Sequence, residues 1–176
     1  MMGTRRIRTM MALMLAVSGF TPAFGDSCGD GESTGADARG LGQPAPAFDL
    51  TTFDGVRFTN ETALGQVLVL DFVAPDCPWC KRHLPRTARL SAAYAAAPVR
   101  FVAVAGQYGA TAFTDAAVLD IVRTAGYAGP LARDVDHRLV QSFAVLLADR
   151  QMHYPTAVVI DGGAAQSDTV YFVRAE

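Results

Sequence analysis

Residues 67–80 read Val-Leu-Val-Leu-Asp-Phe-Val-Ala-Pro-Asp-Cys-Pro-Trp-Cys, and this stretch decides the fold class. Its first seven residues, 67–73, are almost all apolar and include three valines, which is typical of a strand buried on both faces of a sheet. After a short loop, residues 78–96 are rich in Lys, Arg, Leu and Ala, and Pro78 suits the first turn of a helix. The stretch therefore predicts a central strand followed by a long helix.

The rest of the chain continues this alternation of strands and helices. A second buried strand after the helix requires the crossover connection of a parallel sheet, so the predicted class is α/β. The further predicted elements are strands over 100–105, 156–161 and 169–173, and helices over 116–125 and 139–147. No helix is predicted after the last strand.

A β-hairpin is predicted before the central strand. Residues 47–51 and 56–59 flank Asp54-Gly55, a dipeptide that favours a tight turn between two strands. The α/β domain, predicted over 41–176, therefore begins with an N-terminal hairpin extension.

The first 25 residues resemble a secretory signal peptide. Three arginines precede an apolar run over 10–20, and small residues lead to a predicted cleavage after Gly25. The run is shorter than the roughly 20 apolar residues that span a bilayer, so a permanent anchor is the weaker alternative. Residues 26–40 are rich in Gly, Ser, Asp and Glu and are predicted to form a disordered linker.

The composition limits the number of domains and the kinds of partner that the chain can have. The chain has 176 residues, 51% of them hydrophobic, which is enough for one core. Lys and Arg total 15 against 17 for Asp and Glu, so the net charge of -2 offers no broad basic surface. Nucleic acid is therefore not an expected partner.

The chemistry is expected at Cys77 and Cys80, two of the three cysteines. A cysteine at a helix start lies against free amide donors and the positive end of the helix dipole, which favour a thiolate. Cys77 is therefore the predicted nucleophile. Cys80 lies one helical turn further on, close enough to resolve a mixed disulfide at Cys77.

Other readings of these residues stay open. The pair could form a structural disulfide, whereas a four-cysteine zinc site would need a second pair that this sequence lacks. Cys28, in the predicted linker, is interpreted as a bystander, although a flexible thiol could reach the Cys77 site. His83, three residues after Cys80, is interpreted as a solvated helix histidine.

The segment from Leu70 to Lys81, with Pro85 five residues after the second cysteine, resembles the active-site segment of thioredoxin-like proteins. It is most similar to the exported TlpA and ResA-like disulfide reductases, and to the thioredoxin-like accessory protein of methylamine dehydrogenase maturation. The resemblance covers about 41–173. It implies a thioredoxin fold, in which helices flank a central mixed β-sheet.

The resemblance also implies roles for individual residues. Asp71 matches a buried acidic position that moves the proton of the resolving thiol, and a carboxylate inside an apolar strand suits proton transfer. Pro155, after Tyr154, matches a cis-proline that lies against the cysteines and offers backbone groups to a bound peptide. Trp79 is expected to contact a partner. The predicted catalytic residues are thus Cys77, Cys80 and Asp71.

The predicted function is an exported thiol-disulfide oxidoreductase with a redox-active Cys77–Cys80 disulfide and no metal or other cofactor. Its expected compartment is the periplasm, and its expected role is reductase in cytochrome c or periplasmic enzyme maturation. Its expected partners are the thiols and disulfides of client proteins and a membrane thiol reductase that recharges it.

Two alternative functions share the fold or the ligands. A peroxiredoxin needs a threonine three residues before its reactive cysteine, where this chain has Ala74. A Sco-type copper chaperone would use both cysteines and a histidine such as His153, because thiolates and imidazole suit copper. That family, however, separates its cysteines by three residues.

Overall fold

The computed structural model describes residues 43–108, 113–144, 152–163 and 169–174, the last segment through its backbone alone. The predicted signal peptide and linker, with Cys28, lie outside these residues. Within the described ranges, no helix is both long and apolar enough to cross a membrane.

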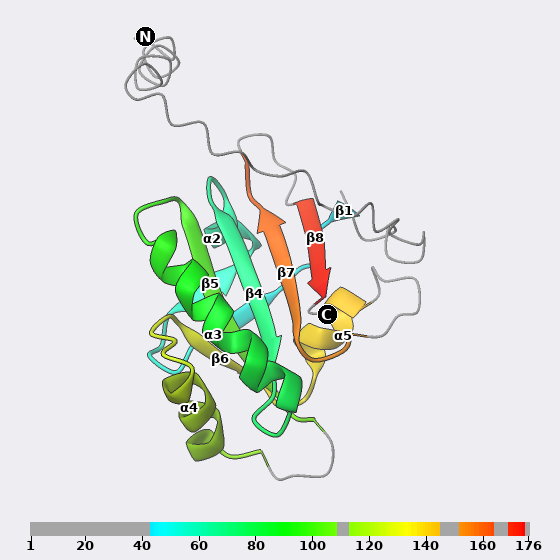
Figure 1. Ribbon diagram of the computed structural model, residues 1–176. Coiled ribbons are helices and arrows are strands. Elements are labelled where there is room, and N and C mark those ends of the chain that lie inside the picture. The colour runs from blue at the N-terminus through cyan, green and yellow to red at the C-terminus, as the bar shows by residue number, and fades with distance from the viewer. Residues whose placement is uncertain (1–42, 109–112, 145–151, 164–168, 175–176) are drawn as a thin grey trace, which may run out of the picture. The chain divides into compact units, whose positions relative to one another are not determined.

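The main sheet has the strand order β1-β8-β7-β4-β5-β6 in the described residues. Its centre is β4 (Val67–Val73), the predicted strand, which pairs parallel with β5 (Val99–Gly106) and antiparallel with β7 (Thr156–Asp161). The edge strands are β6 (Leu131–Asp134) and β1 (Gln43–Pro44), and β8 (Thr169–Arg174) lies between β1 and β7. The predicted α/β class and mixed sheet are confirmed (Figure 1).

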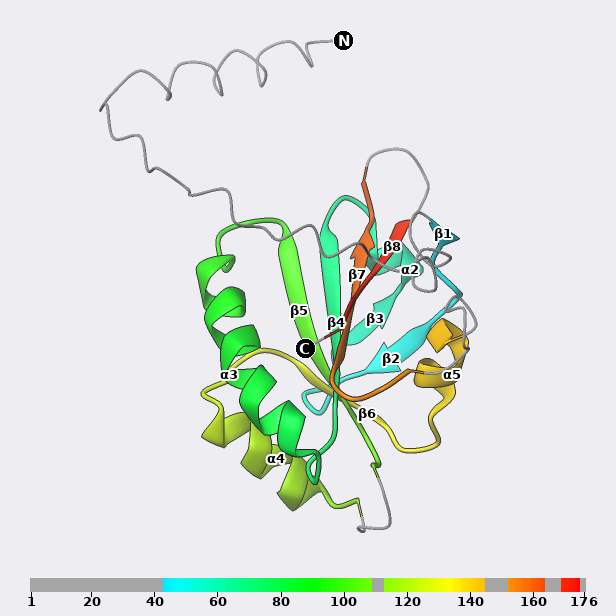
Figure 2. The ribbon, with the colours of Figure 1, turned by 45° about the vertical axis from the view of Figure 1, so that its right-hand side comes forward.

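Two layers cover the sheet, one on each face (Figure 2). One layer consists of α3 (Pro78–Ala93) and α4 (Asp115–Thr124). The other consists of the hairpin of β2 (Asp49–Thr51) and β3 (Arg57–Thr59), with α2 (Asn60–Ala63) and α5 (Arg138–Ala144). The predicted hairpin is confirmed, and Gly55 adopts a φ of 84° in its turn.

The alternation of side chains along β4 divides the core into two clusters. Leu68, Leu70 and Phe72 belong to the cluster under the hairpin and α5. Val73 belongs to the cluster under α3 and α4, which also contains both cysteines of the pair. Because alternate residues of a strand face opposite ways, Asp71 faces the α3 layer together with Val73.

Some elements differ from the sequence prediction. Strand β6 was not predicted, because only four residues form it and Arg133 among them is exposed; pairing with β5 holds it in the sheet. The strand β1 and the helix α2, which are two and four residues long, were also missed. The helix predicted over 139–147 begins at Arg138, and its predicted end lies outside the described residues.

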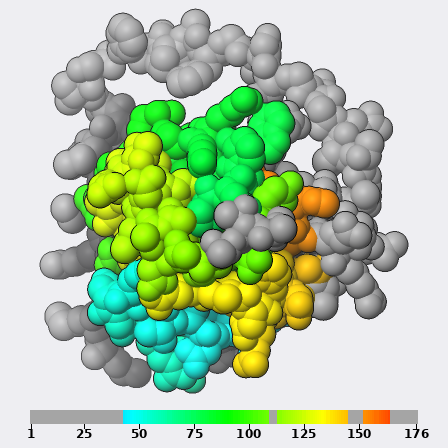
Figure 3. Space-filling view, turned by 90° about the horizontal axis from the view of Figure 1, so that it is seen from below, coloured from blue at the N-terminus to red at the C-terminus, as the bar shows by residue number. Residues whose placement is uncertain are grey.

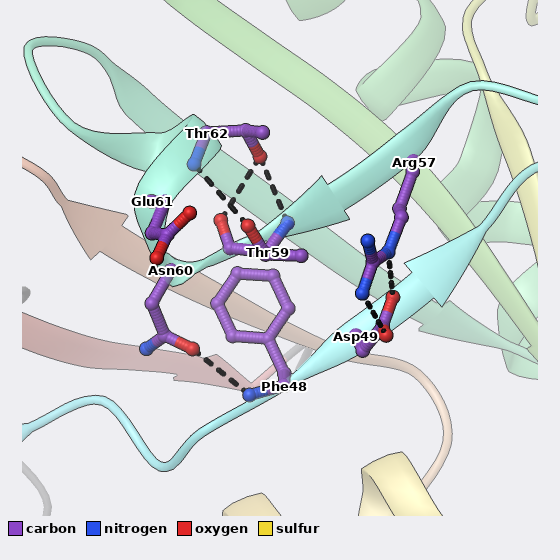
Figure 4. Close-up of a pocket in the computed structure, with 7 residues that line it drawn as sticks. All are labelled: Phe48, Asp49, Arg57, Thr59, Asn60, Glu61 and Thr62. Atoms are coloured by element: carbon purple, nitrogen blue, oxygen red, sulfur yellow. Dashed lines mark hydrogen bonds and ion pairs between the residues drawn. The ribbon is translucent and has the colours of Figure 1, made fainter.

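A pocket of about 390 Å³ lies where the hairpin meets α2 (Figure 4). Its polar groups bind one another: Arg57 donates two hydrogen bonds to Asp49, and the amide of Phe48 donates to Asn60. Thr59 and Thr62 form a capping box at the start of α2. The Arg57–Asp49 pair joins the two strands of the hairpin, and the Phe48–Asn60 bond joins the hairpin to α2. None of the lining residues belongs to the cysteine site.

Gly162 is the position where an added methyl group should destabilise the fold most clearly. A Cβ there would lie 1.9 Å from the carbonyl oxygen of Ala63, a backbone atom that cannot move aside alone. The Gly162 amide also donates a hydrogen bond to the backbone carbonyl oxygen of Gln66 at 3.0 Å. We expect Gly162→Ala to lower the free energy of unfolding by about 3 kcal/mol in urea titrations.

The neighbouring glycine provides the control for this prediction. Of the residues that the structure describes, a Cβ on the exposed Gly163 would approach the Asp161 carboxylate alone, at 3.3 Å. Gly163→Ala should therefore change the free energy of unfolding by less than about 0.5 kcal/mol. Equal losses in the two variants would contradict the close approach at Gly162.

Candidate active site

Cys77 occupies the N-cap of α3, as the sequence predicted for a cysteine at a helix start. Its backbone is extended, with φ −84° and ψ 112°, and its Sγ accepts a hydrogen bond from the Cys80 amide at 3.2 Å. Pro78 follows in the first turn, where its missing donor costs nothing. This places the sulfur where a helix N-terminus stabilises negative charge.

Cys80 lies one turn into α3 and is fully buried. Its Sγ accepts a hydrogen bond from the amide of Ala74 at 3.4 Å, and both cysteines are free thiols. Burial raises the pKa of the Cys80 thiol well above its usual range, and the hydrogen bond with Cys77 raises it further. Cys80 therefore stays protonated unless a nearby base removes its proton.

Asp71 is the buried acid of the site, and two side chains of α3 bind its carboxylate. Thr87 donates a hydrogen bond from its hydroxyl to Oδ2 at 2.6 Å, and His83 places Nε2 at 3.1 Å from Oδ1. The hydroxyl of Thr87 also lies 3.2 Å from the same Nε2. The Asp71 side chain is 0% exposed, whereas that of His83 is 16% exposed.

The surroundings of His83 correct the interpretation made from the sequence. His83 is not a solvated helix histidine, because its ring faces the sheet and pairs with Asp71. The hydrogen bond to Asp71 raises the pKa of His83 above its ordinary value of 6.5, although burial and the charge of Arg86 oppose this shift. His83 and Thr87 were missed as site residues, although their four-residue spacing places them on one helix face.

Tyr154 and Pro155 approach the cysteines from the segment before β7. The peptide bond between them is cis, and Pro155 is buried. The Cys77 thiol donates to the carbonyl oxygen of Tyr154 at 3.6 Å. The ring of Tyr154 lies close against Gly106, and a Cβ at that position would lie 2.0 Å from the tyrosine hydroxyl, so a side chain there would displace the ring.

Trp79, between the two cysteines, is 58% exposed, in keeping with its predicted place at the surface. The guanidinium carbon of Arg82 lies 4.9 Å from the ring centroid, which is a cation–π contact. Tyr108, two residues after β5, is also exposed, and its ring packs edge-on against that of Tyr154 with 6.2 Å between the centroids. In the space-filling view from below, the green atoms of the α3 segment adjoin the yellow-green atoms of the α4 segment (Figure 3).

The described residues offer no group of three or more His, Cys, Asp or Glu side chains placed to hold a metal ion. His153, the residue considered for a copper site, is exposed and does not join Cys77 and Cys80 in such a group.

A dithiol at a helix start, a buried acid behind it and a mixed sheet define a thioredoxin-like thiol-disulfide oxidoreductase. Residues 41–164 match the model of the AhpC/TSA family, so the chain belongs to that family. A search of curated proteins found no match.

Solved structures with the same fold include known redox proteins. MTB DsbF is 26% identical with a TM-score of 0.60, over 76% of this chain and 89% of that chain. A secreted disulfide oxidoreductase of Mycobacterium tuberculosis is 23% identical with a TM-score of 0.57, over 73% and 84%. A thiol:disulfide interchange protein of Chlorobium tepidum is 24% identical with a TM-score of 0.62, over 80% and 89%. The last two show likeness of fold alone.

Proposed function

We propose that this chain is an exported reductase of protein disulfides that works through a redox-active Cys77–Cys80 pair. The observation that carries the proposal is the hydrogen bond from the Cys80 amide to the Cys77 sulfur at the start of α3. This contact supports Cys77 as the nucleophile at the start of the helix and Cys80 as the second thiol, one turn further on, as thiol-disulfide exchange needs.

The exchange runs in two steps. The Cys77 thiolate attacks one sulfur of a client disulfide, the client S–S bond breaks, and the other client sulfur leaves as a thiolate. The Cys80 sulfur then attacks Cys77, which releases the second client thiolate and leaves the Cys77–Cys80 disulfide. The client gains two electrons, and the cysteine pair loses them.

Asp71 accepts the proton of Cys80 in the second step. The buried Cys80 thiol has a raised pKa, so its deprotonation needs a base inside the protein. Asp71 is fully buried on the strand beneath α3, and its charge acts on the Cys80 thiol.

Client proteins bind around Trp79, Tyr154 and Pro155. The exposed indole offers apolar surface, and the carbonyl of Tyr154 already lies beside the attacking sulfur. Cys77 itself is only 1% exposed, so a client must displace neighbouring groups to reach the sulfur.

The proposed compartment is the periplasm, with recharging by a membrane thiol reductase. The proposal is supported by the sequence of the first 25 residues and by the description of the M. tuberculosis relative as secreted. In an oxidising compartment a reductase needs such a source of electrons. Proposed clients are proteins of cytochrome c or periplasmic enzyme maturation.

The reduction potential of the Cys77–Cys80 pair tests the direction of electron flow. After equilibration in defined thiol–disulfide buffers, we expect a value near that of thioredoxin, about −270 mV. The measurement uses the Cys28→Ser variant, so that Cys77 and Cys80 are the only thiols whose oxidation is measured. A value near the roughly −120 mV of a strong oxidant would overturn the reductase assignment.

A further inference from the structure

We infer that His83 is a positioning residue for the resolving step: through its contact with Asp71, it sets how readily that carboxylate accepts the proton of Cys80. The inference rests on the proposed roles of Cys80 and Asp71. The Asp71 carboxylate, the Thr87 hydroxyl and Nε2 of His83 form a triangle of three polar contacts.

The hydrogen-bond partners determine where the hydrogens of this triangle lie. An ionised carboxylate only accepts hydrogen bonds, and the single hydroxyl hydrogen of Thr87 points to Oδ2 of Asp71. While Asp71 is ionised, Nε2 of His83 therefore faces two acceptor oxygens, at 3.1 Å and 3.2 Å, and carries the hydrogen that both contacts need. His83 donates to Asp71 in both of its remaining states, the neutral imidazole and the imidazolium.

These two states act differently on the carboxylate. An imidazolium 3.1 Å away favours the ionised carboxylate and so opposes proton uptake from Cys80. A neutral imidazole keeps the hydrogen bond without the charge, which leaves the carboxylate a better proton acceptor. The resolving step should therefore speed up as His83 loses its proton.

Among the described residues, few other groups around the triangle can change charge in the same pH range. Arg86 on α3 keeps its charge throughout. Tyr127, after α4, has a phenol pKa raised by burial and, to a smaller extent, by the charge of Asp71. Cys77 is bound in the mixed disulfide during this step. The groups that can gain or lose a proton during the resolving step are therefore His83, Asp71 and Cys80 itself.

The resolving step can be timed with dithiobis-nitrobenzoate, a disulfide that releases a coloured thiolate in each of two phases. In the first phase Cys77 attacks the reagent, and the rate depends on reagent concentration. In the second phase the Cys80 S–H proton passes to Asp71, the Cys77–Cys80 bond forms and the second nitrobenzoate thiolate leaves. Stopped-flow traces of the full chain with Cys28→Ser give both rates from about pH 5 to about pH 9.

In the wild-type site, we expect the second-phase rate to rise by about tenfold in a step centred above pH 6.5, where His83 titrates. His83→Gln places a neutral amide donor at the same carboxylate and should remove the step at that pH. Thr87→Val loses the hydroxyl but keeps the imidazole, so it should retain a step. The first phase should be the same in His83→Gln and the parent.

A His83→Gln profile that keeps the step, or that differs from the parent by one constant factor at every pH, would overturn the inference. Release of only one nitrobenzoate per chain would instead contradict the proposed role of Cys80. A further measurement needs no variant at His83: the imidazole of the reduced protein is titrated by NMR. Its midpoint should coincide with that of the second-phase rate, and midpoints separated by more than about one pH unit would also refute the inference.

Discussion

Cys77→Ser is expected to reduce turnover of a disulfide-bonded client protein to the background rate of the assay. The serine hydroxyl can still accept a hydrogen bond from the Cys80 amide at the N-cap of α3, so the variant should fold normally. It cannot supply the thiolate that attacks a disulfide, and the only other thiol in the described residues is buried and has a raised pKa. The measurement is reduction of insulin, with thioredoxin as the positive control.

Cys80→Ser is the matched variant for this experiment. It keeps the nucleophile but cannot resolve, so the covalent Cys77–client disulfide should accumulate to nearly one per chain. A non-reducing gel and intact mass measure this adduct, and added dithiothreitol should dissolve it. The assignment of nucleophile and resolving thiol would be reversed if Cys77→Ser trapped the client and Cys80→Ser did not.

The parts of the fold that could be predicted from sequence are those whose signal is local. The apolar run of β4 predicts a strand buried on both faces, and Pro78 together with the cysteine spacing predicts the start of α3. By contrast, β6 reads Leu-Ala-Arg-Asp and is a strand because β5 lies beside it. Tertiary pairing decides such a segment, and local propensity does not.

The same distinction applies to the site. Cys77 and Cys80 could be found because their chemistry follows from their spacing on one helix. His83 could not be assigned, since the sequence does not say which face of α3 meets the sheet. Thr87 and Cys80 are buried on that face, and the contact with Asp71 on β4 makes His83 part of the site. A pairing across 12 residues between a strand and a helix has no local signal.

Asp71→Asn is expected to slow the resolving step by about 100-fold at neutral pH, because it removes the base while leaving the size of the side chain unchanged. The Asn carbonyl can still accept the hydrogen bond that Thr87 donates to Asp71, so the core should stay packed. The first phase of the nitrobenzoate reaction measures attack by Cys77 and should keep its rate. Equal losses in both phases would point to a disturbed site rather than a missing base.

Combining this variant with His83→Gln separates action through Asp71 from independent action. If His83 works only through the carboxylate that it contacts at 3.1 Å, the double variant should resolve at the same rate as Asp71→Asn alone at every pH. Its second-phase rate should also show no step at the pH where His83 titrates in the parent. Independent contributions would instead multiply, and the double variant would differ from Asp71→Asn, at each pH, by the same factor by which His83→Gln differs from the parent. That outcome would keep Asp71 as the base but would show that His83 does not act through the Asp71 carboxylate.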